Sequence, residues 1–243
     1  MAPNSLFISD LHLGSGVPQR VQGFVHFLDS LGSEIETLYI LGDLFDSYIG
    51  DDDEAGIVLD VRNALGRLAL RGVAICFQQG NRDFLLGEYF LLKAGAVLLD
   101  DYALVQAAGR HVLLTHGDLL CTDDVQYQSV RKLLRSTEWQ RNALAKPLWA
   151  RRLYARWYRL RSFFSKSRKT GEIMDVNLLK VEEVMRLYQV CTLVHGHTHR
   201  PDCHKVDLGH GIQGERWVLA EWKDEGEYLL LDHAGFRRVA VTW

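Results

Sequence analysis

The sequence predicts an α/β domain with a parallel sheet in its first half. In roughly the first 80 residues, apolar runs of strand length alternate with amphipathic stretches of helical spacing, and the turns between them are short. The chain has 243 residues, of which 47% are hydrophobic, so it can bury a large core without disulfides or structural zinc. Strands joined through helices run parallel with right-handed crossovers, and such sheets bind ligands beyond their carboxyl ends.

The individual elements follow from the local pattern. A helix is expected from 54 to 71 because apolar residues recur at helical spacing and the stretch stops at Gly72. The run from 5 to 11 and the runs at 37–41 and 73–78 are typical of buried strands. The other expected elements are a helix at 18–31, strands at 97–99, 102–106 and 111–115, helix-rich sequence at 123–164, a helix at 175–188, a strand at 190–194 and three strands between 216 and 243.

The charge is unevenly distributed. The formal net charge is −3, but the segment 131–169 holds 13 Lys/Arg and one acid, Glu138, whereas the remainder holds 15 bases and 30 acids. This segment also carries Trp139, Trp149, Trp157, Phe163 and Phe164. A basic block on an acidic body indicates an anionic partner such as nucleic acid, lipid headgroups or a polyanionic substrate.

Cysteine use and hydropathy indicate a reducing compartment. Four cysteines form no C-x-x-C pair, and Cys76 and Cys191 lie in apolar runs, where we expect buried thiols. No apolar run approaches the roughly 18 residues that would span a bilayer. Residues 1–5 lack a basic region, so a secretory signal is not expected.

Five apolar runs end in residues that can bind metal. These segments are Asp10-Leu11-His12, Gly42-Asp43-Leu44-Phe45-Asp46, Gly80-Asn81-Arg82-Asp83, His116, and Gly196-His197-Thr198-His199. In extended chain, side chains at i and i+2 point the same way, so Asp10 with His12, and His197 with His199, are expected to bind from one side. Any single Asp or His at a strand end is more often a turn or capping residue. All five segments together predict a binuclear metal site.

The order Asp-x-His, Gly-Asp-x-x-Asp, Gly-Asn-x-Asp, His and Gly-His-x-His resembles the calcineurin-type metallophosphoesterase superfamily. The resemblance implies a four-layer αββα sandwich over residues 1–243, with residues 123–170 inserted as a helical cap. It also implies one metal site made by Asp10, His12, Asp43 and His199, and a second made by Asp43, Asn81, His116 and His197. Asp43 would then bridge two ions, and oxygen and nitrogen ligands suit Mn²⁺.

Residue 82 departs from most of that superfamily, which has His after the Asn, a candidate proton donor to the leaving oxygen. Arginine cannot act as that acid, but it can bind phosphate bidentately. An enzyme without the acid is suited to a leaving group that needs no proton, such as a second phosphate. Arg82 therefore favours cleavage of a phosphoanhydride over an alkyl phosphomonoester.

Longer motifs are similar to one branch, the UDP-2,3-diacylglucosamine diphosphatases. They are Tyr-Ile-Leu-Gly-Asp-Leu-Phe (39–45), Gly-Asn-Arg-Asp-Phe-Leu-Leu-Gly (80–87), Leu-Cys-Thr-Asp-Asp (120–124), Ile-Met-Asp-Val-Asn (173–177) and His-Gly-His-Thr-His-Arg-Pro (195–201). The resemblance implies hydrolysis of UDP-2,3-diacylglucosamine to UMP and 2,3-diacylglucosamine 1-phosphate in lipid A synthesis. It places a peripheral enzyme at the cytoplasmic face of the inner membrane of Gram-negative bacteria, on an anionic surface, with no nucleic acid and no obligate protein partner.

The same branch implies a set of functional residues. Asp43, Asn81 and Arg82 are the expected catalytic residues. Substrate contacts map onto Asn81, Arg82, Asp124, Ser162, Lys166, Lys169 and His197, although Lys166 stands where relatives have a small polar residue. The cap aromatics are expected either to pack the cap or to line an acyl pocket.

Two other functions are compatible with these patterns. A nucleotide phosphodiesterase or nuclease of the same fold would use the basic block to hold nucleic acid. A non-catalytic, metal-dependent scaffold would use the fold to bind partners. The block is interleaved with Leu, Trp, Tyr and Phe, which favours an anionic amphiphile over nucleic acid, and every ligand position is filled, which favours an enzyme.

Overall fold

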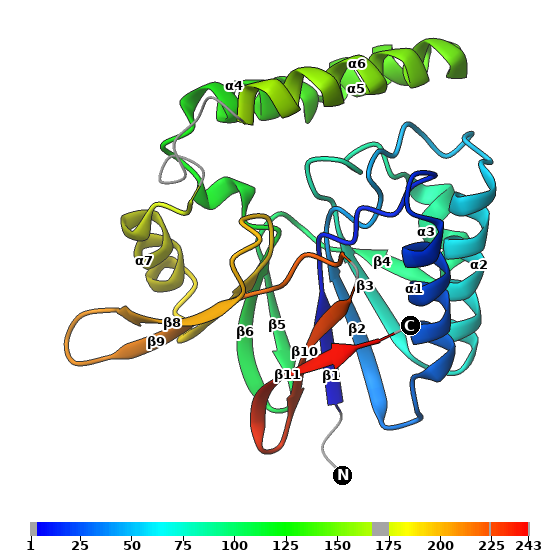
Figure 1. Ribbon diagram of the computed structural model, residues 1–243. Helices are drawn as coiled ribbons and strands as arrows, with labels where there is room; N and C mark the ends of the chain where they lie inside the picture. Colours follow the sequence, from blue (N-terminus) through cyan, green and yellow to red (C-terminus); the bar gives the residue numbers. More distant parts are fainter. Residues whose placement is uncertain (1–3, 167–174, 224, 243) are drawn as a thin grey trace.

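The computed structural model describes residues 4–166, 175–223 and 225–242, and the side chains of 159–166 are not included in the description. Two sheets face each other (Figure 1). The first has the strand order β11-β10-β1-β2-β3-β4 and the second β5-β6-β7-β9-β8. The first sheet contains β1 (Asn4–Ile8), β2 (Ile35–Leu41), β3 (Ala74–Gln78), β4 (Ala96–Leu98), β10 (Gly226–Asp232) and β11 (Gly235–Val241). The second contains β5 (Ala103–Ala107), β6 (Arg110–Thr115), β7 (Thr192–His195), β8 (Asp202–Asp207) and β9 (Gln213–Val218).

Strand directions confirm the parallel sheet expected for the first half of the chain. β1 to β4 are parallel, while β10 and β11 extend the sheet antiparallel. In the second sheet β6, β7 and β9 are parallel, and the edge strands β5 and β8 are antiparallel. Of these strands, β8 was not expected from the sequence.

Alternating side chains in the strands create the layers. In β1, Leu6 and Ile8 pack into the core beneath the helices, whereas Phe7 between them packs between the two sheets. In β6, Leu113 packs on the outer side of the second sheet, and Val112 and Leu114 pack between the sheets. Since successive strand residues point to opposite faces, the central strands of both sheets are buried on both sides.

Helices complete the expected αββα order on the outer faces (Figure 1). The first sheet is covered by α1 (Pro18–Ser30), α2 (Gly56–Leu70) and α3 (Glu88–Ala94), and the second by α7 (Leu178–Leu187). Three further helices, α4 (Val125–Leu134), α5 (Thr137–Leu144) and α6 (Leu148–Lys166), lie above the ends of the sheets. Of the seven α-helices in the described ranges, α3 was not expected from the sequence. No helix within the described ranges is long and apolar enough to span a bilayer.

The helices α4 to α6 are attached to the body through arginines. Arg131 pairs with Asp118 at 2.6 Å and Asp101 at 2.9 Å, and Arg151 and Arg152 pair with Asp52 and Asp53. Arg135 donates to the backbone carbonyls of Gln79 and Gly80, both at 2.9 Å. Part of the charge asymmetry is therefore satisfied within the molecule, because acids of the body bind bases of α4 to α6.

Two expectations about side-chain burial differ from the structure. All four cysteines are free, but Cys191 is exposed and Cys76 only partly buried. Cys191 immediately precedes β7, so it lies outside the buried part of that strand. In α6, Trp149 and Trp157 are 70% and 50% exposed, so neither packs a core or lines a closed pocket.

Candidate metal centre

The candidate metal ligands follow the carboxyl ends of five strands and meet at one edge of the two sheets. We call this group of seven residues the metal rim. Asp10 and His12 follow β1, Asp43 follows β2, and Asn81 follows β3. In the second sheet, His116 follows β6, and His197 and His199 follow β7. The two sheets thus supply ligands from opposite sides, and the contacts below connect all seven residues.

The backbone that orients these side chains is not in the extended conformation expected from the sequence. Strands β1 and β7 end before the ligands, and Asp10, His12, Asp43, His197 and His199 all have left-handed φ values between 49° and 67°. They are five of the eight non-glycine residues with such values in the described chain. Left-handed backbone costs about 1 kcal/mol or more per residue and tends to cluster at functional sites. The strain is held by backbone hydrogen bonds, among them Asp10 N to Gly42 O at 3.1 Å and His12 N to Asp43 O at 3.0 Å.

Glycines allow the loops to approach one another closely. Gly42 has a φ of 82°, and a Cβ there would lie 2.6 Å from the Cα of Gly80 and 2.8 Å from Nδ1 of His116. At Gly196, a Cβ would collide with the side chains of Ser9 and Asp10. A side chain at either position would push the strand ends apart.

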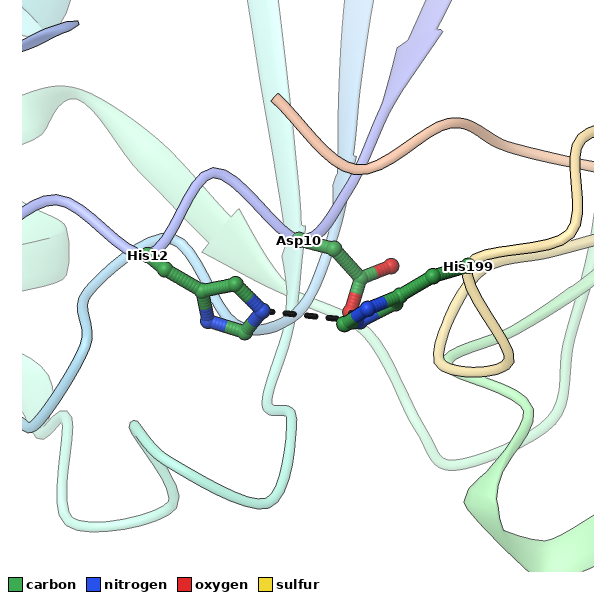
Figure 2. A group of neighbouring side chains, drawn as sticks. All are labelled: Asp10, His12 and His199. Atoms are coloured by element: carbon green, nitrogen blue, oxygen red, sulfur yellow. Dashed lines mark hydrogen bonds and ion pairs between the residues drawn. The ribbon is translucent and has the colours of Figure 1, made fainter. Parts of the chain in front are cut away.

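One half of the rim consists of Asp10, His12 and His199, whose ligand atoms lie within 4.8 Å of one another (Figure 2). Nε2 of His199 is 3.1 Å from Oδ1 of Asp10 and 3.5 Å from Nε2 of His12. The other Asp10 oxygen accepts from the Ser9 hydroxyl at 2.7 Å and from the backbone of His197 at 2.8 Å. Asp10 is therefore fixed, with Oδ1 facing the imidazoles.

The other half is built around His116. Its Nδ1 donates to the carbonyl of Leu41 at 2.8 Å, which turns Nε2 toward Oδ1 of Asn81 and Nδ1 of His197, both at 3.2 Å. Asp43 lies between the two halves: Oδ2 is 3.9 Å from Nδ1 of His12, and Oδ1 is 3.9 Å from Nε2 of His116. Oδ1 also accepts from the backbone of Arg82 at 2.8 Å.

The electrostatics of the rim favour a cation. Asp10 and Asp43 are buried carboxylates, and burial and the charge of Asp10 raise the pKa of Asp43. Burial lowers the pKa of His12 to about 3, whereas hydrogen bonds to Asp10 and Glu221 outweigh burial and raise that of His199 to about 9. Nδ1 of His12 is buried and has no hydrogen-bond partner in the described part of the chain. A buried group of carboxylates and imidazoles with an unsatisfied nitrogen fits divalent metal binding.

Several residues that support the rim were not assigned a role from the sequence. Asp83, which is fully buried, accepts from the backbone of Gly80 at 2.7 Å and Leu44 at 2.8 Å, so it ties together the loops after β3 and β2. Its place in the Gly-Asn-x-Asp motif was the available signal. His195 is also fully buried and is held by Arg216 at 3.0 Å, while Glu221 contacts His199 at 3.1 Å. The contacts of His195 with Arg216 and of Glu221 with His199 join segments far apart in the sequence, so no local sequence pattern indicates them.

The expected substrate contacts are only partly described. Arg82 extends its guanidinium to Asp46 at 2.9 Å, next to the rim. Asp124 caps α4 by accepting from the backbone of Tyr127 at 3.1 Å, and the ring of Tyr127 lies 5.8 Å from that of His197. Ser162 and Lys166 belong to the part of α6 whose side chains are not described, and Lys169 lies outside the described residues.

A cavity of about 450 Å³ runs from the rim into the space beneath α5 and α6. Asn81 and Arg82 line it beside the rim, and Asn142, Lys146 and Arg151 add polar side chains farther along. Most of the remaining lining is apolar or aromatic, including Tyr48, Ile49, Phe84, Leu85, Leu134, Trp139 and Tyr154. Trp139 lines the cavity and also packs against Phe84 at a ring distance of 5.9 Å.

Comparisons with known proteins agree with this geometry. A sequence profile described as calcineurin-like phosphoesterase matches residues 4–201. The chain belongs to this family. It is 45% identical to a UDP-2,3-diacylglucosamine hydrolase of Aromatoleum aromaticum over 96% of this chain and 94% of the relative. A protein of the same name from Chromohalobacter salexigens is 44% identical over 90% and 89%. Within this family, the chain thus belongs with the UDP-2,3-diacylglucosamine hydrolases.

A solved structure shows the same fold in a more distant protein. An archaeal phosphodiesterase covers 98% of this chain and 99% of its own, with a TM-score of 0.50 and 14% identity. This likeness supports the αββα architecture of the phosphoesterase family.

Proposed function

We propose that this protein hydrolyses the diphosphate bond of UDP-2,3-diacylglucosamine, releasing UMP and 2,3-diacylglucosamine 1-phosphate for lipid A synthesis. The observation that carries the proposal is the continuity between the metal rim and the apolar cavity, with Asn81 and Arg82 at the junction. A diphosphate at the rim would leave acyl chains in the cavity, whose volume lies in the range typical of ligand pockets. The names of the 41–45% identical relatives agree with this substrate.

In this proposal Asp10, His12 and His199 would hold one Mn²⁺ ion, Asn81, His116 and His197 would hold a second, and Asp43 would be shared by both. Asp43 is suited to a shared role because, among the side chains that the structure describes, the nearest donor to its Oδ2 is Arg82 Nε at 3.7 Å. When bound, two such ions polarise a phosphoryl oxygen and lower the pKa of an attacking water.

Side chains of the protein carry out the other proposed steps, which are substrate orientation and stabilisation of the leaving phosphate. Asn81 orients the phosphate from the carboxyl end of β3, and Arg82 exchanges its ion pair with Asp46 for one with the substrate diphosphate. A guanidinium there stabilises the charge that develops on the leaving phosphate without giving up a proton. The backbone N–H of Arg82 meanwhile holds Asp43 in place. Asp124, Ser162, Lys166, Lys169 and His197 complete the proposed substrate contacts.

We propose that residues 123–170 form a cap inserted into one domain of residues 1–243. The cap places the apolar walls Trp139 and Tyr154 over the loops that follow β2 and β3. Arg131, Arg135 and Arg151 bind the body, so these three bases do not belong to an anion-binding surface. The apolar cavity and the exposed Trp149 and Trp157 favour an amphiphilic partner over nucleic acid. We propose instead that the protein binds peripherally to the anionic cytoplasmic face of the inner membrane, where a diacyl substrate resides.

The test is to incubate the protein with UDP-2,3-diacylglucosamine and Mn²⁺ in ¹⁸O-labelled water and to identify the products by mass. We expect UMP and 2,3-diacylglucosamine 1-phosphate in equal amounts, with one labelled oxygen in one of them. Chelation of the metal should stop the reaction, and restoring Mn²⁺ should recover it. Hydrolysis of bis(p-nitrophenyl) phosphate without cleavage of the UDP-lipid would contradict the proposal and favour a phosphodiesterase.

A further inference from the structure

Glu221 lies behind the metal rim in the loop between β9 and β10. The backbone N–H of the next residue, Trp222, donates to the carbonyl of Asp10 at 3.2 Å. The indole of Trp222 is completely buried, with rings of Phe24 and Phe27 packed edge-on against it. This anchoring fixes the loop beside the end of β1 and brings the Glu221 carboxylate to the rim.

The carboxylate contacts both histidines of one half-site. Oε2 of Glu221 is 3.1 Å from Nδ1 of His199, and Oε1 is 4.0 Å from Nε2 of His12. The side chain of Glu221 is only 19% exposed, and the Nζ of Lys223 lies 3.1 Å from Oε2. Glu221 is thus a mostly buried anion, held in place on one side by a lysine and on the other by the imidazoles.

The hydrogen bond to Glu221 determines which nitrogen of His199 faces the rim. An imidazole that donates from Nδ1 to a carboxylate presents Nε2 as its free ligand atom. In the structure this Nε2 points to Oδ1 of Asp10 and to His12, as Figure 2 shows. Without an acceptor at Nδ1, the His199 ring could rotate or use the wrong tautomer, and its left-handed backbone would not prevent this.

We propose that Glu221 is a positioning residue that sets the orientation and tautomer of His199 and so strengthens metal binding at the Asp10, His12 and His199 half-site. The inference rests on the binuclear site of the proposed function, but it concerns metal binding and is measured without substrate. The half-site around His116 has its own orienting acceptor, the Leu41 carbonyl, so Glu221 acts on one half only.

The experiment titrates Mn²⁺ into the metal-free protein by isothermal calorimetry for wild type, Glu221→Gln and Glu221→Ala. The matched control is Glu215→Gln, which removes the same charge from β9, where Glu215 pairs with exposed Lys205. We expect Glu221→Ala to weaken one of two binding steps about 10- to 100-fold, the effect typical of losing a partner of a metal-ligating histidine. Glu221→Gln should lose less, because its amide oxygen still accepts from Nδ1. The other step and the control should stay near wild type.

A second readout separates positioning from a general structural effect. Electron paramagnetic resonance at two Mn²⁺ per chain, at a protein concentration between the two dissociation constants of the affected step, should show isolated ions in Glu221→Ala where wild type shows a coupled pair. Metal-free Glu221→Gln should keep a single cooperative thermal transition and the far-ultraviolet circular dichroism spectrum of wild type. Two unchanged binding steps, or equal weakening of both, would overturn the inference. Loss of UDP-lipid cleavage in wild type with the two-step metal pattern intact would instead count against the proposed function.

Discussion

The metal rim and the helices α4 to α6 are held in place by different kinds of interaction. At the rim, loops that follow adjacent strands bring buried Asp, His and Asn side chains within a few ångströms, and five of the ligands have strained backbone. In α4 to α6, arginines bind the body from outside, and large apolar side chains such as Trp149 and Leu153 stay exposed. The sheets thus fix the candidate metal ligands in place, whereas α4 to α6 are joined to the body by polar contacts, an arrangement compatible with the proposed role of a cap in recognition.

The largest effect should follow removal of the shared carboxylate. Asp43→Asn keeps the shape of the side chain but removes the charge that lies between His12 and His116. We expect kcat to fall by at least about 10³-fold, the upper range for one preorganised electrostatic group, and the metal content of the purified protein to fall below two ions. Mass spectrometry of the metals and initial rates measure both quantities.

The control for this variant is Asp29→Asn, which removes a surface carboxylate paired with Arg67. Surface ion pairs contribute little, so its rate and metal content should be those of wild type. An Asp43→Asn protein that keeps two ions and the wild-type rate would show that the rim does not operate as a binuclear site.

Arg82 is where the two regions meet, because its backbone binds Asp43 and its side chain lines the cavity. Arg82→Ala should lower kcat/KM on the UDP-lipid about 10²–10³-fold, as loss of a transition-state donor does. Arg82→Lys should recover only part, since a point charge cannot replace the planar fork. Both variants keep the backbone N–H, so their metal content should stay unchanged.

Arg82→His tests the leaving-group argument directly. It supplies the proton donor that an alkyl leaving group needs and a phosphate leaving group does not. The ratio of kcat/KM for an alkyl phosphodiester to that for the UDP-lipid should therefore rise, measured at one pH and one Mn²⁺ concentration. If that ratio were unchanged with both metals bound, residue 82 would not determine the preference for an anhydride.

The contrast between the regions also explains what the sequence could predict. All seven candidate ligands were located from motifs, because each lies a few residues after a strand and parallel strands converge at their carboxyl ends. The extended backbone that we expected to orient Asp10 and His12 was wrong, because both residues have left-handed φ values. Amino-acid composition does not reveal such backbone strain. Glu221 and the ion pair of Arg151 with Asp52 join residues far apart in the sequence, so periodicity could not reveal them.

A cap variant should affect recognition far more than chemistry. Arg151, which is 7% exposed at its side chain, binds Asp52, the carbonyl of Ile49 and, at 2.9 Å, the carbonyl of Lys146. Arg151→Ala should destabilise the protein by about 1–3 kcal/mol, the cost of unsatisfied buried acceptors. We expect KM for the UDP-lipid to rise about tenfold, which corresponds to about 1.4 kcal/mol, with kcat nearly unchanged.

The measurement for this variant compares two substrates. The activity on bis(p-nitrophenyl) phosphate should stay within about twofold of wild type, since that small diester needs the rim but not the cap. Arg152→Ala, which removes an exposed pair with Asp53, is the matched control and should change neither substrate. Equal losses on both substrates would mean that the cap helps to position the catalytic groups.

The smallest effect concerns the outer face of α6, where Trp149, Leu153 and Trp157 are spaced by four residues and are 70%, 63% and 50% exposed. Residues at this spacing share one helix face, and the exposed Arg156 extends from the same helix, so the face suits an anionic lipid surface. Each basic residue close to such a surface contributes about 1 kcal/mol, screened by salt.

Trp149→Ser with Trp157→Ser should reduce binding to anionic vesicles several-fold and leave hydrolysis of bis(p-nitrophenyl) phosphate unchanged. High salt should release much of the wild-type protein in a flotation assay, whereas equal binding to zwitterionic and anionic vesicles at low salt would show that charge does not guide this region to the membrane.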